Sequence, residues 1–387
     1  MNVGEKNKQE CSGCTACSFV CTHNAITMEP DKLGFLYPHI DNEKCIDCGL
    51  CVKKCEFKED YSVYDNFEAP IIYGGRLKDA SALAASQSGG AAFAICECFI
   101  KYGGIVYGVV FDDNFHVIHT KVDKVEELAK LKGSKYVQSY LGDTFQQVRD
   151  NLMSNEKVLF VGTACQVAGL KSYIPQKYHT KLYTIDILCH ACPSPNLWES
   201  YLQHIQKTNK GKIVTANMRN KKYGWRSFHE TYQLSNGKEI KRESYIFLFF
   251  HHLSIKKSCE VCYFTNHRRV SDITLSDFWG WSKFHPEWND DKGVSMIMVN
   301  SEKGTLLLND INTVMSLIKS DESEIDHLQP QLSRPSKANP LRDSFEQDFS
   351  EKGFRYVSKK YGDENWKEQI KKIIRPFYLQ LRNIRKK

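Results

Sequence analysis

Alternating apolar and polar stretches divide the middle of the chain into strands and helices. Residues 105–111 (IVYGVVF) form a short, continuous apolar run that predicts a buried strand. Residues 158–161 and 182–188 predict two more strands, and a helical pattern separates them. Strands that alternate with helices are typical of an α/β unit, here with a mostly parallel or mixed sheet. In such sheets ligands bind at the carboxyl ends of the strands.

The two ends of the chain show different patterns. Residues 26–38 (ITMEPDKLGFLYP) predict a short hairpin that turns at residues 31–34. In residues 365–387, apolar side chains recur at steps of three and four, with basic side chains largely on the other face. This pattern predicts a helix that Pro376 kinks. The helix either docks on the body of the protein or lies on an anionic membrane surface.

Eight of the fifteen cysteines form two runs with the same C-x2-C-x2-C-x3-C spacing. The runs are Cys11, Cys14, Cys17 and Cys21, then Cys45, Cys48, Cys51 and Cys55. Three thiolates on one tight loop can hold one face of a 4Fe–4S cluster, and the fourth cysteine then binds the other cluster. The spacing therefore predicts one cluster on Cys11, Cys14, Cys17 and Cys55, and another on Cys45, Cys48, Cys51 and Cys21. Zinc fits less well, because zinc ribbons use two CxxC pairs rather than two triplets.

Two loops have residues suited to an anionic ligand. Residues 86–90 (SQSGG) precede a helical pattern, where small residues let backbone N–H groups approach a phosphate. An ordinary N-cap with a glycine turn explains the same residues. In residues 133–136 (GSKY), Lys135 is suited to a phosphate and Tyr136 to stacking on a ring, although a solvated turn is the simpler interpretation.

A third group of cysteines occurs in the α/β segment. Cys165 and Cys189 follow two predicted strands, so they are expected near each other at the carboxyl edge of the sheet. Cys259 and Cys262 form a CxxC that completes a four-thiolate site with Cys165 and either Cys189 or Cys192. On spacing alone, a zinc knuckle and a redox dithiol remain alternatives.

Composition and charge narrow the class of protein. Hydrophobic residues make up 41% and aromatic residues 12% of the 387 residues, as in a folded globular protein. Residues 1–60 have a net charge of −3 and residues 351–387 of +8, which argues against a uniform nucleic-acid-binding face. The first ten residues contain no signal-peptide core, and the apolar run 245–250 is too short for a bilayer. Fifteen cysteines in such a chain predict a cytoplasmic, reducing location.

Several motifs in a fixed order give the chain a family resemblance. They are SQSGGAA from residue 86, GSKYVQS from 133, VLFVGTACQVAGL from 158, CHACPSPNLW from 189, MRNKKYGW from 218, CEVC from 259 and DITLSDFWG from 272. Residues 80–300 thereby resemble the beta subunit of coenzyme F-420 reducing hydrogenase and its relatives, including formate dehydrogenase beta subunits. Two motifs depart from the family pattern. The family's GTPCQ is GTACQ here, with Ala164 in place of the proline. The family's CHG is CHA here, with Ala191 in place of the glycine, and an additional cysteine, Cys192, follows.

The resemblance implies an FAD-binding domain that contains its own 4Fe–4S cluster. The third cluster would be held by Cys165, Cys189, Cys259 and Cys262. The FAD-binding residues would be Ser86, Ser88, Gly89, Gly90, Gly133, Ser134, Lys135, Tyr136, Gly162, Thr163 and Gln166. The additional Cys192 leaves open whether Cys189 or Cys192 is the cluster ligand. No catalytic side chain is implied, and Arg219, Lys221 and Lys292 are candidates to neutralise an anionic substrate or a reduced flavin.

Together these features predict four segments: a two-cluster ferredoxin-like α+β domain at 1–60, a linker at 61–79, an FAD- and cluster-containing oxidoreductase domain at 80–335, and a basic helical tail at 336–387. The predicted function is electron transfer between 4Fe–4S clusters and a two-electron substrate through FAD. Expected partners are a redox protein or a small molecule, of which deazaflavin is one candidate and a sugar or lipid-linked molecule another. Nucleic acid is not expected, whereas the basic tail makes peripheral membrane contact a hypothesis. The alternatives are an electron-transfer subunit of a larger enzyme and a zinc-stabilised binding module.

Overall fold

The structure, a computed structural model, describes residues 2–325, 328–370 and 374. Its helices are α1 (Ala16–Val20), α2 (Leu50–Lys53), α3 (Ala80–Ala85), α4 (Ala91–Lys101), α5 (Thr144–Met153), α6 (Ala164–Tyr173), α7 (Pro195–Asn209), α8 (Ser244–Phe250), α9 (Glu302–Ile311) and α10 (Arg342–Tyr361). Its strands are β1 (Ile26–Pro30), β2 (Leu36–Ile40), β3 (Ile71–Leu77), β4 (Ile105–Phe111), β5 (Val117–Val122), β6 (Val158–Thr163), β7 (Leu182–Ile187), β8 (Ile213–Asn217), β9 (Glu230–Leu234), β10 (Glu239–Arg242), β11 (Ile273–Asp277), β12 (Ser295–Val299) and β13 (Met315–Ser320).

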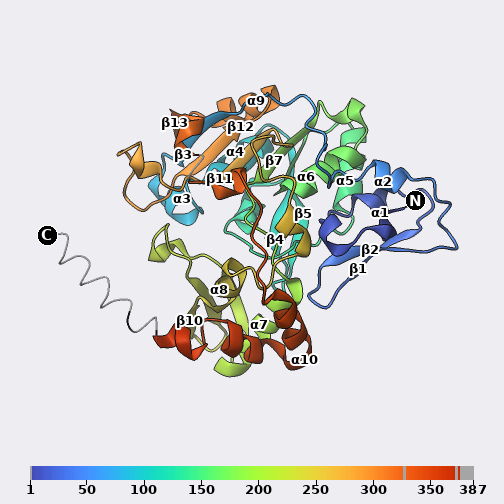
Figure 1. Cartoon of the computed structure of the whole chain (residues 1–387). Helices are drawn as coiled ribbons and strands as arrows, with labels where there is room; N and C mark the ends of the chain where they lie inside the picture. The colour runs from blue at the N-terminus through green and yellow to red at the C-terminus, as the bar shows by residue number, and fades with distance from the viewer. Residues whose placement is uncertain (1, 326–327, 371–373, 375–387) are drawn as a thin grey trace.

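An eight-stranded mixed sheet forms the centre of the larger lobe, in the upper part of Figure 1. Its strand order is β13-β3-β12-β11-β7-β6-β4-β5. Strands β4, β6, β7 and β11 run parallel to one another, and β3 shares their direction because it and β11 are both antiparallel to β12. The predicted mixed α/β architecture is therefore confirmed.

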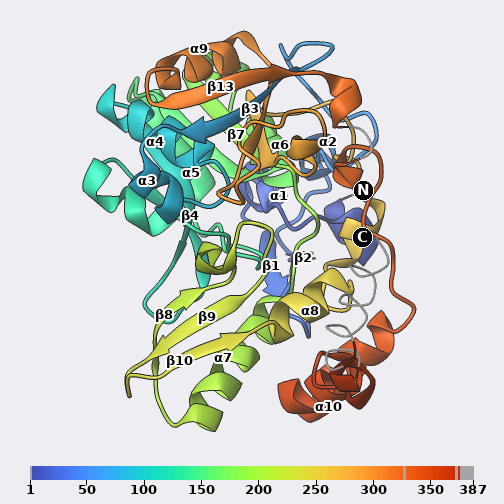
Figure 2. The ribbon, with the colours of Figure 1, turned by 90° about the vertical axis from the view of Figure 1, so that its left-hand side faces the viewer.

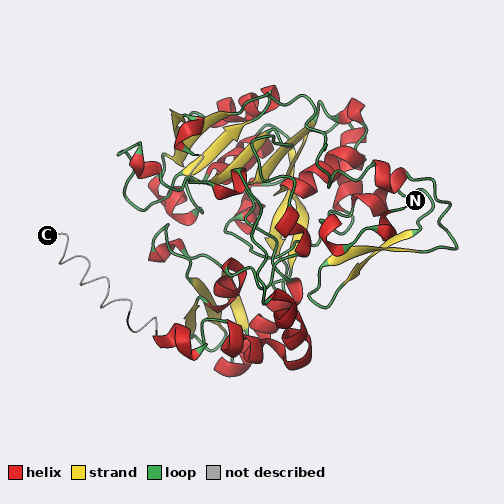
Figure 3. Ribbon diagram, in the orientation of Figure 1, coloured by secondary structure: helices red, strands yellow, loops and turns green. Residues whose placement is uncertain are grey.

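Helices cover both faces of this sheet, as the secondary-structure colours in Figure 3 show. Val106 and Leu159 pack with α4 and α9, whereas the next residues along, Tyr107 and Phe160, pack with α5 and α6. Successive side chains of a strand point to opposite faces, so strands buried on both faces need apolar residues throughout. This requirement explains the unbroken apolar runs in the sequence.

The prediction of a linker at residues 61–79 is wrong for its second half, because this segment contains β3. This strand pairs with β12 on one side and β13 on the other. Its two central glycines conceal it in the sequence. A Cβ on Gly74 would lie 2.0 Å from the Trp281 ring, so the tryptophan packs directly on the strand backbone.

A smaller lobe contains the antiparallel sheet β10-β9-β8 with α7, α8 and α10, in the lower part of Figures 1 and 2. Its core is rich in aromatic side chains, among them Trp198, Tyr201, Tyr232 and Tyr245. Glu230 is fully buried among them. Its carboxyl group accepts hydrogen bonds from the Tyr201 and Tyr232 hydroxyls at 2.7 and 2.8 Å and from the Ile246 N–H at 2.8 Å.

The N-terminal unit packs firmly on the larger lobe. Phe19 of α1 contacts Phe145 of α5 and Tyr173 of α6, with ring centroids 5.5 Å apart in both cases. Lys54 Nζ donates to the Ser172 carbonyl, and the Ser172 hydroxyl donates back to the Lys54 carbonyl, both at 2.8 Å. The unit is therefore attached to α5 and α6 by side-chain packing as well as by the chain.

The predicted hairpin of this unit is β1 and β2. Asp31 forms the turn, because its Oδ1 accepts the N–H groups of Leu33 and Phe35 at 3.0 Å. The Leu33 carbonyl then accepts the Ser194 hydroxyl at 2.6 Å, at the start of α7. The hairpin tip therefore reaches the smaller lobe, in agreement with both views of the ribbon (Figures 1 and 2).

The C-terminal part of the chain contributes α10 to the smaller lobe, where Phe345 and Phe349 join the aromatic core. Most of the predicted kinked helix at 365–387 lies outside the described residues, and so does the membrane contact predicted for it. Within the described residues, Trp366, Ile370 and Ile374 are exposed. In the part of the chain that the structure describes, no helix has the length and apolar character needed to span a bilayer.

Burial predicts a pH-dependent stability for the smaller lobe, because it raises the pKa of Glu230 to about 7 from an ordinary value of 4.5. When the pKa of a carboxyl is higher in the folded than in the unfolded state, its contribution to stability is complete below the unfolded-state pKa. That contribution is lost as the pH rises from there through the folded-state pKa. The loss amounts to about 3 kcal/mol. Glu230→Gln should flatten the decline in thermal unfolding midpoint between about pH 4.5 and 7. Glu239→Gln, on exposed β10, is the matched control and should leave the profile unchanged.

Candidate functional site

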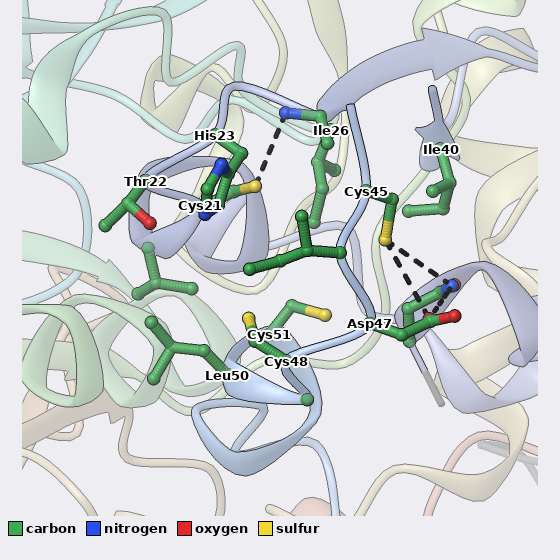
Figure 4. Close-up of a pocket in the computed structure, with 15 residues that line it drawn as sticks. Cys21, Thr22, His23, Ile26, Ile40, Cys45, Asp47, Cys48, Leu50 and Cys51 are labelled. Carbon is green, nitrogen blue, oxygen red and sulfur yellow. Dashed lines mark hydrogen bonds between the residues drawn. The ribbon is translucent and has the colours of Figure 1, made fainter. Parts of the chain in front are cut away.

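Four cysteines of the N-terminal unit line one pocket between α1, α2 and the hairpin. They are Cys21, Cys45, Cys48 and Cys51, and we call them the distal set. Figure 4 shows these thiols with apolar side chains around them, among them Ile26 and Ile40. The Ala25 N–H donates to Cys21 Sγ at 3.4 Å, and Asn2 Nδ2 donates to Cys45 Sγ at 3.9 Å. The structure therefore brings together the four thiols that the spacing assigns to one cluster.

The other four thiols of this unit also lie together, and we call them the proximal set: Cys11, Cys14, Cys17 and Cys55. Burial, followed by the charge of Cys55, raises the pKa of the Cys14 thiol to about 12. Burial and the charges of Cys14, Cys11 and Cys55 raise the pKa of Cys17 well above its usual range. Lys6 Nζ donates to Cys55 Sγ at 3.2 Å.

Five thiols lie near one another where the cores of the two lobes meet, and we call them the inner set: Cys165, Cys189, Cys192, Cys259 and Cys262. Burial and the charges of Cys192, Cys165 and Cys262 raise the pKa of Cys189 well above its ordinary value. Burial and the charges of Cys192, Cys189 and Cys262 do the same for Cys259. The Cys192 N–H donates to Cys259 Sγ at 3.3 Å. Cys189 and Cys192 are therefore both near the CxxC, and the choice of ligand between them stays a prediction.

The chemistry of these thiols fits iron–sulfur clusters. Buried thiols close to one another are costly to ionise alone, and a metal cluster supplies the positive charge that makes them thiolates. Within the described residues, no group of three or more His, Cys, Asp or Glu side chains is placed to hold a single metal ion. The thiols lie near one another without converging on one ion position.

The three sets are neighbours in a fixed order. Cys17 of the proximal set interacts electrostatically with Cys51 of the distal set. Cys14 interacts with Cys165 of the inner set, and its Sγ would lie 2.8 Å from a Cβ on Gly169. Gly169 is on α6, the helix that carries Cys165 near its start. The absent side chain at Gly169 thus lets the proximal thiols approach the inner ones.

The predicted flavin-binding residues at 86–90 are bonded within the protein. The Ser86 hydroxyl donates to the Ala82 carbonyl at 2.7 Å, and the Ser88 hydroxyl donates to the Val294 carbonyl at 2.8 Å. A Cβ on Gly89 would lie 2.0 Å from the Gly75 carbonyl oxygen. This loop is therefore locked against β3 and β12, and Gly90 begins α4 with a positive φ of 86°.

Gly162, Thr163 and Gln166 support the start of α6. Thr163 and Gln166 form a capping box, and Gln166 Nε2 also donates to the Ser139 hydroxyl at 2.9 Å. The Thr163 hydroxyl lies 3.2 Å from Cys165 Sγ. In this structure these residues position an inner thiol.

The loop at 133–136 places a lysine beside an aromatic side chain. Lys135 Nζ donates to the carbonyls of Leu131, Lys132 and Gly133, and burial lowers its pKa to about 8. Tyr136 packs on Phe249, with ring centroids 5.4 Å apart. Ser134 is half-buried, and a Cβ on Gly133 would meet no atom within 4 Å.

Two of the three cationic candidates, Lys221 and Arg219, lie near each other. Lys221 Nζ donates to the carbonyls of Leu83, Ser86 and Ser88 at 2.7, 3.1 and 2.7 Å, and burial lowers its pKa to about 8. Arg219 is 1% exposed, pairs with Asp277 and lies over the rings of Phe228 and Trp279. Lys292, in contrast, is exposed on an open cleft with a volume of about 450 Å³ that Arg76 and Trp288 also line.

Strand direction explains why these groups lie along one edge of the sheet. Strands β3, β6, β7 and β11 all point the same way, so their carboxyl ends share one edge of the sheet. The loop at 86–90 follows β3 and α3, Cys165 follows β6, and Cys189 follows β7. Asp277, at the end of β11, was not among the predicted residues; its position at a strand end is the signal that identifies it.

Comparisons with known proteins agree with this description. Residues 155–323 match the family described as the C terminus of the "Coenzyme F420 hydrogenase/dehydrogenase, beta subunit", and residues 10–58 match a 4Fe-4S dicluster domain. The resemblance inferred from the motifs and the 4Fe–4S unit are thereby confirmed.

Individual relatives are more distant. The coenzyme F420-dependent sulfite reductase of Methanocaldococcus jannaschii is 28% identical over 177 residues, which are 44% of this chain and 26% of that protein. The chain thus spans about a quarter of the length of this curated relative. A chain of the F420-reducing NiFe hydrogenase complex from Methanosarcina barkeri is 15% identical with a TM-score of 0.44, covering 76% of this chain and 92% of that one.

Metal analysis tests the ligand sets. We expect about twelve iron and twelve acid-labile sulfides per chain, from three four-iron clusters. Cys259→Ala should lower the iron to about eight, because an open iron position is exposed to water and oxygen. We expect the same loss for Cys189→Ala and none for Cys192→Ala.

Two outcomes would contradict these expectations. Loss of the inner iron from Cys192→Ala alone would transfer the ligand role to Cys192. About eight iron with one zinc in the unaltered chain would show that the inner set binds zinc.

Proposed function

We propose that this chain, whose residues 155–323 match the coenzyme F420 hydrogenase/dehydrogenase beta subunit family, is an iron–sulfur flavoprotein oxidoreductase. It transfers electrons between 4Fe–4S clusters and a two-electron substrate through FAD. The observation that carries this proposal is the succession of distal, proximal and inner thiol sets, which ends at the carboxyl edge of the large sheet.

The residues present suit the chemistry of these groups. A 4Fe–4S cluster exchanges single electrons, and a flavin converts between one- and two-electron chemistry. The chain contributes the thiols, in an order fixed by the packing of α1 on α6. It also contributes apolar walls such as Ile26 and Ile40, which limit water around the distal thiols.

Two lysines support the proposed FAD site. All three hydrogen bonds of Lys135 and all three of Lys221 go to main-chain carbonyls. These bonds use the three N–H donors of each ammonium, so what each lysine offers a nearby anion such as a diphosphate is its net positive charge in a partly desolvated place, not a hydrogen bond. Arg219, which is paired with Asp277 and lies over the rings of Phe228 and Trp279, borders the same region. FAD combines a diphosphate, which suits the positive charges, with a flat ring system, which suits the aromatic side chains.

The substrate is proposed by class. The sulfite reductase named above is described as coenzyme F420-dependent, so a deazaflavin is the first candidate for the two-electron substrate. A second function, an electron-transfer subunit that serves a partner enzyme, is favoured by the surface over the distal set. Cys48 is exposed there, and the neighbouring Ile46 is 62% exposed. An exposed apolar side chain beside a redox centre suits transient contact with a redox protein.

Anaerobic reconstitution tests the proposed function. The purified chain should retain extractable FAD and reduce or oxidise at least one of deazaflavin, nicotinamide coenzyme and ferredoxin. Turnover of deazaflavin or a nicotinamide by the isolated chain would favour the enzyme over the electron-transfer subunit. A chain that holds zinc and no flavin would support a binding module instead.

Substitution of two adjacent lysines, Lys221 and Lys222, tests the proposed position of the flavin. Lys221→Met should weaken FAD binding roughly tenfold or more, because it removes a positive charge beside the proposed diphosphate and the hydrogen bonds that hold the loop at 86–90 around it. Iron content should stay unchanged. Lys222→Met is the matched control, since Lys222 is the next residue and its side chain is exposed. Equal FAD affinity in both variants and the parent chain, measured by fluorescence titration, would place the flavin elsewhere.

A further inference from the structure

Lys256 is a buried cation between the proximal and inner thiol sets. It is 1% exposed. Its backbone belongs to the inner site: the Lys256 N–H donates to the Cys192 carbonyl at 2.9 Å, and the Cys259 N–H donates to the Lys256 carbonyl at 3.0 Å. The backbone of Lys256 is therefore held between two cysteines of the inner set.

The side chain extends to the N-terminal unit. Lys256 Nζ donates to the Leu36 carbonyl at 3.1 Å and lies 3.5 Å from the centroid of the Tyr37 ring. It would be 3.2 Å from a Cβ on Gly13, in the loop between Cys11 and Cys14. The ammonium group thus lies beside the loop that carries the proximal thiols.

The charge of Lys256 acts on both sets. It interacts electrostatically with Cys11 on the proximal side and with Cys192 and Cys259 on the inner side. Asp31 also interacts with it, but the Asp31 carboxylate is engaged by Lys8 Nζ at 2.8 Å and by the hairpin turn. A buried ammonium is costly without a nearby anion. The thiolates on its two sides are the anions that this arrangement supplies.

We propose that Lys256 is a positioning residue that provides one positive charge shared by the proximal and inner clusters and raises the reduction potential of both. The inference rests on the cluster ligation proposed above. An added electron makes a cluster more negative, and a fixed cation nearby in a low-dielectric region stabilises the reduced form. Because the same charge faces both clusters, it moves their potentials in one direction.

Lys6 offers a matched comparison. Its Nζ donates to Cys55 Sγ, and it also interacts electrostatically with Cys11, so its contacts are with the proximal set. Removal of each charge should therefore give a different pattern. Lys6→Met should lower the proximal potential alone, whereas Lys256→Met should lower the proximal and inner potentials together. The distal cluster should stay unchanged in both variants and serves as an internal reference.

The experiment is a redox titration of the reconstituted full chain, followed by electron paramagnetic resonance. In Lys256→Met, reduction of each of the two clusters should become at least tenfold less favourable, a shift of about 59 mV to more negative potential. Lys256→Arg should retain the potentials of the parent chain. Iron is counted in every variant, so that loss of a cluster is not mistaken for a shift.

The outcomes separate this inference from the proposed function. A parent chain without inner iron would overturn the ligation itself. Full iron with unchanged potentials in Lys256→Met would show that Lys256 only joins the two units mechanically and would overturn the inference. Lys256→Met and Lys256→Gln could both lose iron that Lys256→Arg keeps. The shared positive charge would then be needed for cluster assembly, and this outcome would support the inference. Loss of iron from the arginine variant as well would assign the role to packing and overturn the proposal.

Discussion

The electrostatics of buried thiols is the constraint on which the rest of the structure depends. Thirteen cysteines lie in three adjacent sets, and burial raises the thiol pKa of members such as Cys14 and Cys189. Thiols in this state become metal ligands only where positive charge compensates them. The surrounding structure therefore has to keep the proximal and inner thiols away from water, hold the three sets close to one another, and place cations beside them. Lys6 and Lys256 are placed accordingly.

The large sheet meets this constraint through strand direction. Strands that run the same way bring Cys165, Cys189 and Asp277 to one edge, and α6 then extends from that edge to the N-terminal unit. Gly169 lets a proximal thiol lie against the helix. One helix thus serves two purposes: its start positions an inner thiol through the Thr163 cap, and its middle receives the N-terminal unit.

Sequence reasoning succeeded where spacing alone determines geometry. The cysteine runs predicted the two sets of the N-terminal unit, and the apolar runs predicted β4, β6 and β7. It failed where a residue is explained by a neighbour distant in sequence: Gly74 hides a strand because Trp281 packs on it. Lys256 was missed for the same reason, since its partners Cys11 and Leu36 lie more than two hundred residues earlier.

The proposed flavin residues illustrate how a motif combines structural and chemical roles. Ser86 and Ser88 use their hydroxyls within the protein, and their carbonyls occupy donors of the Lys221 ammonium, so what this place offers a ligand is the positive charge of Lys221. Burial has already lowered the pKa of this lysine to about 8, so removing more water would favour its neutral form. An anion bound beside it would reverse that tendency and stabilise the charged form. The small residues of the motif therefore serve to bring backbone oxygens around a cation, and binding of a diphosphate would depend on that cation more than on the serines.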